Sequence, residues 1–296
     1  MYNGVVVLNK PKGKTSHDMI YFMRRTAMQK RVGHTGTLDP NATGVLPICL
    51  GNATKASDYI ANGRKKYLAH IHFGIVTDTE DLCGNILEKK EVASFSEDEF
   101  LSVLNSFIGN IKQIPPMYSA VKINGKKLYE LARKGETVNR NAREICIYSI
   151  DLKEFDMQNK SAVIEVCCSK GTYIRTLCSD IGKALGCGAC MGDLKRIQSG
   201  AFNIEDSHTA EMIERAAENN ELEKLIIPTD KLFEEFRAVF VGAKDEFKVK
   251  NGVTLSGFDG YEGEKVRIYG QDNNFLCISQ MQNGILKMLT SFWSVN

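Results

Sequence analysis

One stretch restricts what this chain can fold into more than any other, residues 31–44: Arg-Val-Gly-His-Thr-Gly-Thr-Leu-Asp-Pro-Asn-Ala-Thr-Gly. It holds three glycines, three threonines and a proline, so we expect an irregular loop rather than a helix or a strand. The apolar run Val45–Leu50 follows directly and predicts a buried strand that anchors the loop. The loop carries one imidazole, His34, and one carboxylate, Asp39, and both are candidates for chemistry.

The residues alone leave two interpretations of Asp39 open. Asp39 precedes Pro40, and an aspartate before a proline commonly starts a turn, as most glycine-rich loops do. Alternatively, a single carboxylate on a rigid loop is a usual way to present a catalytic acid, base or nucleophile.

Length and charge limit the class of protein. With 296 residues, 43% of them hydrophobic, the chain can bury one large domain or a large and a small one. The net charge of +2 does not by itself indicate a nucleic-acid partner. From residue 10 to 34, however, the basic residues outnumber the single acid Asp18, which is typical of a phosphate-binding surface, although a solvated helix face looks the same. These basic residues are Lys10, Lys12, Lys14, Arg24, Arg25, Lys30 and Arg31.

Cysteine usage and hydropathy favour a cytoplasmic protein. We expect the nine cysteines to be reduced thiols, because no signal peptide is recognisable. Cys187 and Cys190 have the C-x-x-C spacing, but no second pair stands at a zinc-like distance, so we predict no zinc site. No apolar run approaches the roughly 20 residues that span a bilayer, so we predict no membrane segment.

The acidic run Thr77–Gly84 raises the question of a divalent metal. It lacks the regular ligand spacing and the closing Glu of a calcium loop, so we interpret it as a structural turn. A metal-dependent nuclease that uses Asp78 and Asp81 is the least favoured alternative for the whole chain.

The pattern G-H-T-G-T-L-D-P-x-A-T-G, residues 33–44, resembles the catalytic loop of the TruB family, the tRNA pseudouridine synthases that act on the T-loop uridine. In that family the aspartate of the loop is catalytic, which implies this role for Asp39. The histidine, here His34, lies against the RNA where the flipped base had stacked. The family's acidic turn, similar to residues 77–84, has no metal role, and the resemblance implies neither a cofactor nor a metal.

Three further family motifs have counterparts in this chain. Asn9–Ser16 is similar to the first motif, which places a basic residue, Lys10, at the rim of the active site. Tyr67 follows two lysines in an alternating, strand-like run, and the matching tyrosine stacks on the target uracil and is a candidate late general base. Leu194 matches the leucine that lines the uracil pocket. Tyr67 and Leu194 would equally suit a sheet face and a core.

Arg175 needs a partner on physical grounds. The pair Gly171 and Thr172 predicts a helix over about Tyr173–Leu185, and the helix dipole disfavours a cation such as Arg175 in its first turn. A carboxylate partner would remove that cost. The segment resembles the family motif Lys-Gly-Thr-Tyr-Ile-Arg-[Thr/Ser]-Leu, whose arginine pairs with the catalytic aspartate, so we pair Arg175 with Asp39 and expect Tyr173 to bind substrate.

Residues 113–143 combine a proline pair, a short helix over about Lys127–Arg133, tyrosines and several basic residues. Basic side chains can contact the phosphate backbone of RNA along its length, and aromatic rings can stack on its bases. The two together suit an RNA-binding segment. The segment resembles the family's Pro-x-x-Tyr-Ser-Ala-x-Lys insertion, which closes over the RNA. We therefore predict that it is mobile without RNA and ordered with it.

By resemblance, the fold is α+β: the pseudouridine synthase fold, with a mixed, mainly antiparallel sheet and flanking helices. Residues 1–235 are expected to form the catalytic domain, with residues 113–143 as an RNA-binding insertion. From about residue 236 the chain becomes glycine-rich, with short apolar runs including Val249, so residues 236–296 are predicted to form a small β-domain. Its position fits the family's PUA-like domain.

The leading hypothesis is an enzyme that flips uridine 55 out of the T-loop of tRNA, breaks its glycosidic bond and rejoins the base through carbon. Asp39 must be ionised for this chemistry, and a guanidinium partner favours the charged form. We expect a monomer that needs no protein partner. The main alternative is an RNA chaperone that flips and refolds tRNA while Asp39 does no chemistry.

Overall fold

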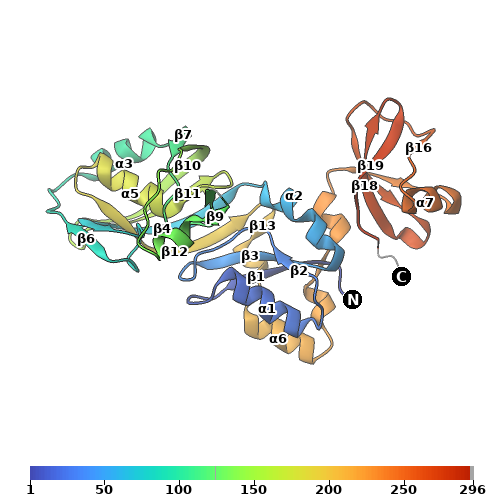
Figure 1. Cartoon of the computed structure of the whole chain (residues 1–296), viewed down its shortest axis with the longest axis horizontal. Coiled ribbons are helices and arrows are strands. Elements are labelled where there is room, and N and C mark those ends of the chain that lie inside the picture. Colours follow the sequence, from blue (N-terminus) through green and yellow to red (C-terminus); the bar gives the residue numbers. More distant parts are fainter. Residues whose placement is uncertain (124, 294–296) are drawn as a thin grey trace.

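The structure is a computed structural model that describes residues 1–123 and 125–293. Within these residues the strands form a ten-stranded main sheet, a five-stranded second sheet and two short hairpins. Figure 1 shows helices along the main sheet and the second sheet at the far end of the molecule, near the C-terminus. The predicted α+β fold, a mainly antiparallel mixed sheet with flanking helices and a small C-terminal β-unit, is confirmed.

The main sheet consists of two halves that meet at a short seam. In the described residues its strand order is β14-β1-β3-β12-β4-β11-β10-β7, with β2 paired to β3 and β13 to β12. All these pairs are antiparallel except β3 and β12, which run parallel over only two residue pairs, Thr43–Lys195 and Gly44–Arg196. The strands are β1 Gly4–Lys10, β2 Val32–His34, β3 Thr43–Leu50, β4 Lys65–Phe73, β7 Gly109–Gln113, β10 Arg143–Asp156, β11 Ser161–Cys168, β12 Ala189–Ser199, β13 Phe202–Asn203 and β14 Ile227–Pro228.

The larger helices cover one face of this sheet. Met19 of α1, Phe100 of α3, Leu177 of α5 and Ile213 of α6 share one buried cluster with Ile71 and other inward-facing strand residues. Thr15 and Asp18 form a capping box that satisfies the first free N–H groups of helix α1. The helices are α1 Ser16–Thr26, α2 Ser57–Ala61, α3 Glu97–Ser106, α4 Leu128–Ala132, α5 Ile174–Ala184, α6 Ala210–Glu218 and α7 Ala243–Lys250.

Short hairpins and 3-10 turns connect the larger elements. The hairpins are β5 Ile75–Thr77 with β6 Ile86–Lys89, and β8 Lys122–Ile123 with β9 Lys126–Lys127. The 3-10 turns are η1 Gly51–Ala56, η2 Ile204–Asp206, η3 Leu222–Leu225, η4 Thr229–Phe233 and η5 Gln271–Asn273. No helix in the described part of the chain is long and apolar enough to cross a membrane.

The second sheet has its own core and one helix that the sequence pattern did not predict. Its strands, in the order β15-β17-β18-β19-β16, are β15 Arg237–Phe240, β16 Leu255–Ser256, β17 Lys265–Tyr269, β18 Phe275–Gln282 and β19 Ile285–Ser291. The strand-like interpretation of Val249 is wrong: this residue is buried on the inner side of α7. The sheet is joined to the main sheet by an aromatic cluster around Phe233 and Phe292 and by a hydrogen bond from Asn52 Nδ2 to the Phe292 carbonyl, 2.9 Å long.

The glycine-rich loop of residues 31–44 is only partly irregular. Its first residues, Val32–His34, form β2 and pair with Leu50–Ile48 of β3, so the expectation that no strand lies there is wrong. The glycine there is tolerated because the strand is short and lies at the edge of the β1–β3 half. Residues 35–42 remain irregular and carry Asp39 to the seam, where β3 begins.

Gly44 fixes this seam. Its φ is +102°, and a Cβ atom added there would stand 2.2 Å from the backbone oxygen of Arg196 on β12. We expect Gly44→Ala to lower the free energy of unfolding by about 3 kcal/mol or more, because neither backbone can retreat without breaking the two parallel pairs. Urea unfolding measures the change. Gly284→Ala is the matched control, since Gly284 also has a positive φ (+74°) but faces open space; equal losses in the two variants would contradict the clash.

Candidate active site

Asp39 is held by contacts between its loop and the turn that follows β1. The backbone N–H of Gly13 donates to the Pro40 carbonyl over 2.9 Å, and the Ser16 hydroxyl accepts from the Leu38 N–H over 2.8 Å. Leu38 is buried in the main core. The carboxylate of Asp39 is 40% exposed, so the loop is anchored on both sides while its charged tip remains open to solvent.

Arg175 makes the ion pair with Asp39 that the family resemblance implies, and it thereby has the carboxylate partner that the helix dipole calls for. Its Nε donates to Asp39 Oδ2 over 2.9 Å, and its Nη2 approaches Oδ1 at 3.4 Å. The remaining donors reach backbone carbonyls: Nη1 binds Thr79 at 2.8 Å and Nη2 binds Tyr118 at 2.9 Å. The guanidinium is 5% exposed and therefore fixed, whereas its partner carboxylate is accessible. A charge on Asp39 is stabilised without being shielded from a ligand.

The acidic turn between β5 and β6 supports this arginine. Asp81 Oδ2 lies 3.7 Å from Arg175 Nε, and Asp81 also accepts from the Thr79 hydroxyl and the Cys83 N–H. Asp78 accepts from the backbone N–H and the side-chain amide of Asn85. Both carboxylates are thus engaged by donors of the protein, which agrees with a structural turn. Among the described residues no cluster of three or more metal-ligating side chains gathers.

Lys10 lies beneath the loop and not at the rim where the sequence motif placed it. It is fully buried, and its Nζ donates to the carbonyls of Pro11, Lys14 and Pro40 at 2.6–2.9 Å. Burial lowers the pKa of Lys10 to about 8, and the nearby Asp39 opposes that shift. A lysine with three carbonyl partners has no donor left for a ligand. Lys10 therefore shapes the Asp39 loop.

Tyr67 and His34 stand around a buried arginine, Arg196. Tyr67 on β4 pairs with Arg196 on β12 and is 7% exposed. Burial raises the pKa of the Tyr67 phenol, while the adjacent Arg196 charge acts in the opposite direction. Burial also lowers the pKa of His34, so its ring is neutral at pH 7. Its Nδ1 is buried and makes no hydrogen bond within the described residues.

Arg196 is the functional candidate that sequence reasoning missed. It is 1% exposed, and its guanidinium donates to the carbonyls of Val45 at 2.7 Å and Gly36 at 3.0 Å. It therefore ties both ends of the Asp39 loop to β12. The sequence contained the information: residues two apart on a strand share a face, so a buried Leu194 implied a buried Arg196.

Tyr173 is positioned by a second missed residue, Gln113. The Gln113 side chain accepts from the Tyr173 N–H over 2.8 Å and donates to the Tyr173 carbonyl over 3.1 Å. These two hydrogen bonds hold the backbone of Tyr173, the N-cap of α5, two residues before Arg175. Gln113 is the last residue of β7 and lies 60 residues before Tyr173, so no local sequence pattern predicts this contact.

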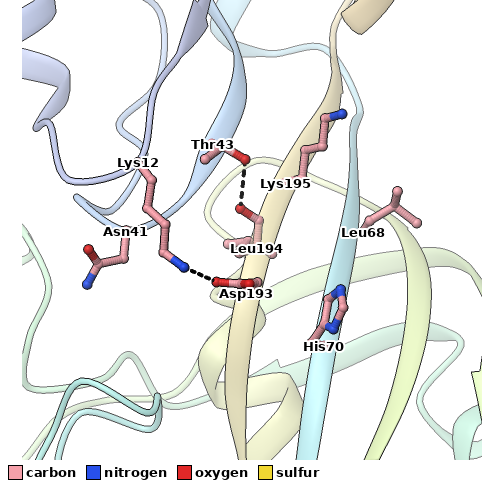
Figure 2. A pocket seen from close by; sticks show the side chains of 8 residues that line it. All are labelled: Lys12, Asn41, Thr43, Leu68, His70, Asp193, Leu194 and Lys195. Atoms are coloured by element: carbon pink, nitrogen blue, oxygen red, sulfur yellow. Dashed lines mark hydrogen bonds and ion pairs between the residues drawn. The ribbon is translucent and has the colours of Figure 1, made fainter.

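Leu194 is buried beside the seam and lines a pocket of about 260 Å³ (Figure 2). The Thr43 hydroxyl lies 3.5 Å from the Leu194 carbonyl, which joins β3 to β12 there. The structure thus brings Asp39, Arg175, Tyr67, His34 and Leu194 to the two sides of one seam.

Comparison with known proteins assigns the chain to a family. The sequence matches the family model described as "TruB family pseudouridylate synthase (N terminal domain)" over residues 24–174. It matches the model "tRNA pseudouridylate synthase B C-terminal domain" over residues 175–234. The ion pair of Asp39 and Arg175 therefore joins the two matched regions.

Curated relatives and solved structures agree. The chain is 46% identical to "tRNA pseudouridine synthase B" of Clostridium perfringens over 273 residues, which cover 92% of this chain and 88% of that protein. It is 49% identical to the protein of the same name from Oceanobacillus iheyensis, covering 86% and 84%. The structure described as "Crystal Structure of a Cbf5-Nop10-Gar1 Complex" superposes with a TM-score of 0.71 and 26% identity, covering 98% of this chain and 85% of that one.

A further solved structure, an H/ACA RNP bound to a substrate RNA containing 2'-deoxyuridine, has a TM-score of 0.72 at 24% identity and shows the same fold, covering 98% and 85%. The fold and the family models define a pseudouridylate synthase, an isomerase. Within that class, the chain belongs to the TruB family.

Proposed function

We propose that this protein isomerises uridine 55 in the T-loop of tRNA to pseudouridine. The observation that carries the proposal is the pair of Asp39 and Arg175: an accessible carboxylate held at 2.9 Å by a buried guanidinium. The names of the curated relatives support tRNA as the substrate. The bond from N1 to C1′ of the sugar breaks, the uracil turns, and a bond from C5 to C1′ forms. The C5 proton leaves to solvent and N1 takes up a proton, so that product and substrate are isomers.

Each side chain has a proposed part in this reaction. Asp39 supplies the negative oxygen that acts on the nucleotide, and Arg175 holds that oxygen in its orientation through the 2.9 Å ion pair. The base must leave its stack, which costs a few kcal/mol, and the neutral ring of His34 fills the vacated place. Tyr67 stacks on the extruded uracil, a contact worth about 1–3 kcal/mol for a base on an aromatic ring. Leu194 and Tyr173 contact the extruded base.

We also propose how the chain divides its work. Residues 1–235 act as the catalytic unit, residues 113–143 as the RNA-binding insertion, and residues 236–296 as a PUA-like unit that adds grip on tRNA. We propose a cytoplasmic monomer that acts without a protein partner. Elution of the purified chain at the mass of one copy would support the monomer.

The direct test is tritium release from a T-arm stem-loop labelled at C5 of the target uridine, followed by mass analysis of the product RNA. We expect stoichiometric release with the wild-type protein and none from the same RNA carrying cytidine at the target position. Tight binding of the RNA without any release would contradict the proposed reaction.

The insertion yields a separate prediction. Its first residue, Gln113, binds the Tyr173 backbone, and its Tyr118 carbonyl accepts from Arg175, whereas Arg140 bonds within the insertion, to the Pro115 carbonyl. We expect limited proteolysis of the free protein to cut first within residues 113–143 and saturating T-arm RNA to slow those cuts by about tenfold. Cleavage that starts elsewhere, or that RNA leaves unchanged, would contradict a segment that closes over the substrate.

A further inference from the structure

A groove at the seam of the main sheet contains charged residues that the proposed reaction leaves without a role. It is the pocket of about 260 Å³, lined among others by Lys12, Asn41, His70, Asp193 and Lys195. His70 alternates along β4 with the buried Ala69 and Ile71, and Asp193 and Lys195 flank the buried Leu194 on β12. The polar side chains therefore point away from the core and into the groove.

In the described part of this groove, two lysines, Lys12 and Lys195, stand against one acid. Lys12 comes from the turn after β1, and Lys195 and His70 come from two neighbouring strands of the other half of the sheet. Asp193 is the one acid among the described residues that line the groove. A cleft lined by cations with a single counter-charge is suited to an anion.

Asp193 already forms an ion pair with one of these cations, Lys12. Figure 2 shows Lys12 reaching across the seam to Asp193, with Nζ 2.5 Å from Oδ1. The two side chains are 59% and 66% exposed, and such exposed pairs add little to the stability of a fold. The pair is therefore free to open when a better anion arrives. Backbone phosphates offer Lys12 the same kind of oxygen that Asp193 offers now.

The groove lies next to the proposed reacting centre. Asn41 in its wall is two residues from Asp39, which limits the distance between their Cα atoms to about 7 Å. The turn that carries Lys12 is bonded to the same loop through Gly13 N–H and the Pro40 carbonyl. A strand of RNA that delivers a uridine to Asp39 therefore brings neighbouring phosphates within reach of the groove.

We propose that this groove binds a backbone phosphate of the RNA substrate next to the reacting uridine, and that Asp193 holds Lys12 in place until that phosphate displaces it. The inference rests on the proposed function, because it takes RNA as the ligand. It assigns binding roles to Lys12 and Lys195, and to Asp193 the role of an internal competitor that weakens binding of anions other than a well-placed phosphate.

The test measures the affinity of a T-arm stem-loop for the full-length protein at several monovalent salt concentrations. We expect Lys12→Gln and Lys195→Gln each to weaken binding about fivefold at 0.1 M salt and to reduce the slope of log K against log salt by about 0.7–0.9. Asp193→Asn should act in the opposite direction, tightening binding by about twofold to fivefold, because the competing carboxylate is gone.

Glu234→Gln is the matched control, because Glu234 pairs with Lys231 at 2.6 Å with similar exposure, 57% and 54%, away from the groove. It should leave affinity and slope unchanged. Inorganic phosphate should not compete with RNA below about 10 mM, because one contact is weak without the rest of the strand. The inference fails if Asp193→Asn behaves like Glu234→Gln, if the lysine variants keep the wild-type slope, or if inorganic phosphate competes at low concentration. Tritium release by the wild type would show in each case that the proposed function stands without the groove.

Discussion

Asp39→Asn is expected to lower the single-turnover rate of pseudouridine formation by about ten-thousand-fold or more while the affinity for T-arm RNA changes less than about threefold. The amide keeps the shape of the side chain but removes the negative oxygen, and loss of a group that acts directly on the substrate typically costs this much. The carboxylate is 40% exposed, so its replacement leaves no buried cavity. Tritium release under saturating enzyme measures the rate, and filter binding measures the affinity.

The same variant separates an enzyme from an RNA chaperone. A chaperone that only flips and refolds tRNA would keep its activity without the carboxylate, because no bond to the base is broken. Asp58→Asn, an exposed acid at the start of α2, is the control for the loss of one charge and should match the wild type. Near-normal conversion of uridine by Asp39→Asn would remove Asp39 from the chemistry and, with it, the proposed mechanism.

Residues close together in the sequence determine where the helices around the site begin, whereas the pairing of distant strands determines the rest. The caps of α1 and α3 are each made by two residues three positions apart, Thr15 with Asp18 and Ser96 with Glu99. The helix predicted over about Tyr173–Leu185 is α5, Ile174–Ala184. The need of Arg175 for a carboxylate partner could also be inferred, because a cation in the first turn of a helix requires compensation that the local chain does not supply. The identity of that partner, Asp39, came from the resemblance to the family.

The seam between β3 and β12 could not be predicted in this way. Among the described residues, the strand pairing between the two halves of the sheet consists of Thr43–Lys195 and Gly44–Arg196 alone. No pattern within either strand indicates a parallel partner so far away in the chain. The burial of Arg196 could have been inferred from its spacing to Leu194, but its partners could not, because its guanidinium binds carbonyls of another segment, Val45 and Gly36. Val249 was misplaced because a short apolar run fits a strand and a helix equally well.

Arg175→Lys is expected to reduce the single-turnover rate by about a hundredfold to a thousandfold, even though the positive charge is kept. Arginine holds Asp39, the Thr79 carbonyl and the Tyr118 carbonyl at once through a rigid planar fork, whereas an ammonium group cannot reach all three positions. The free energy of unfolding should fall by about 2–3 kcal/mol, since buried carbonyls lose their donors. Urea unfolding and tritium release, both measured at about 25 °C where the variant is folded, give the two values.

If Arg175 has a purely structural role, the rate of Arg175→Lys falls only by the fraction of the protein that is unfolded. If Arg175 positions Asp39, the rate falls by much more than that fraction. Arg25→Lys provides the reference, because Arg25 meets Glu214 at 3.4 Å on the surface with its guanidinium 76% exposed, and its loss should affect neither rate nor stability. If stability falls in Arg175→Lys while the rate at saturating RNA stays normal, the guanidinium only supports the fold, and the ionised Asp39 needs no partner. A loss of rate far larger than the unfolded fraction can explain would instead mean that this fork sets the geometry in which Asp39 meets the uridine.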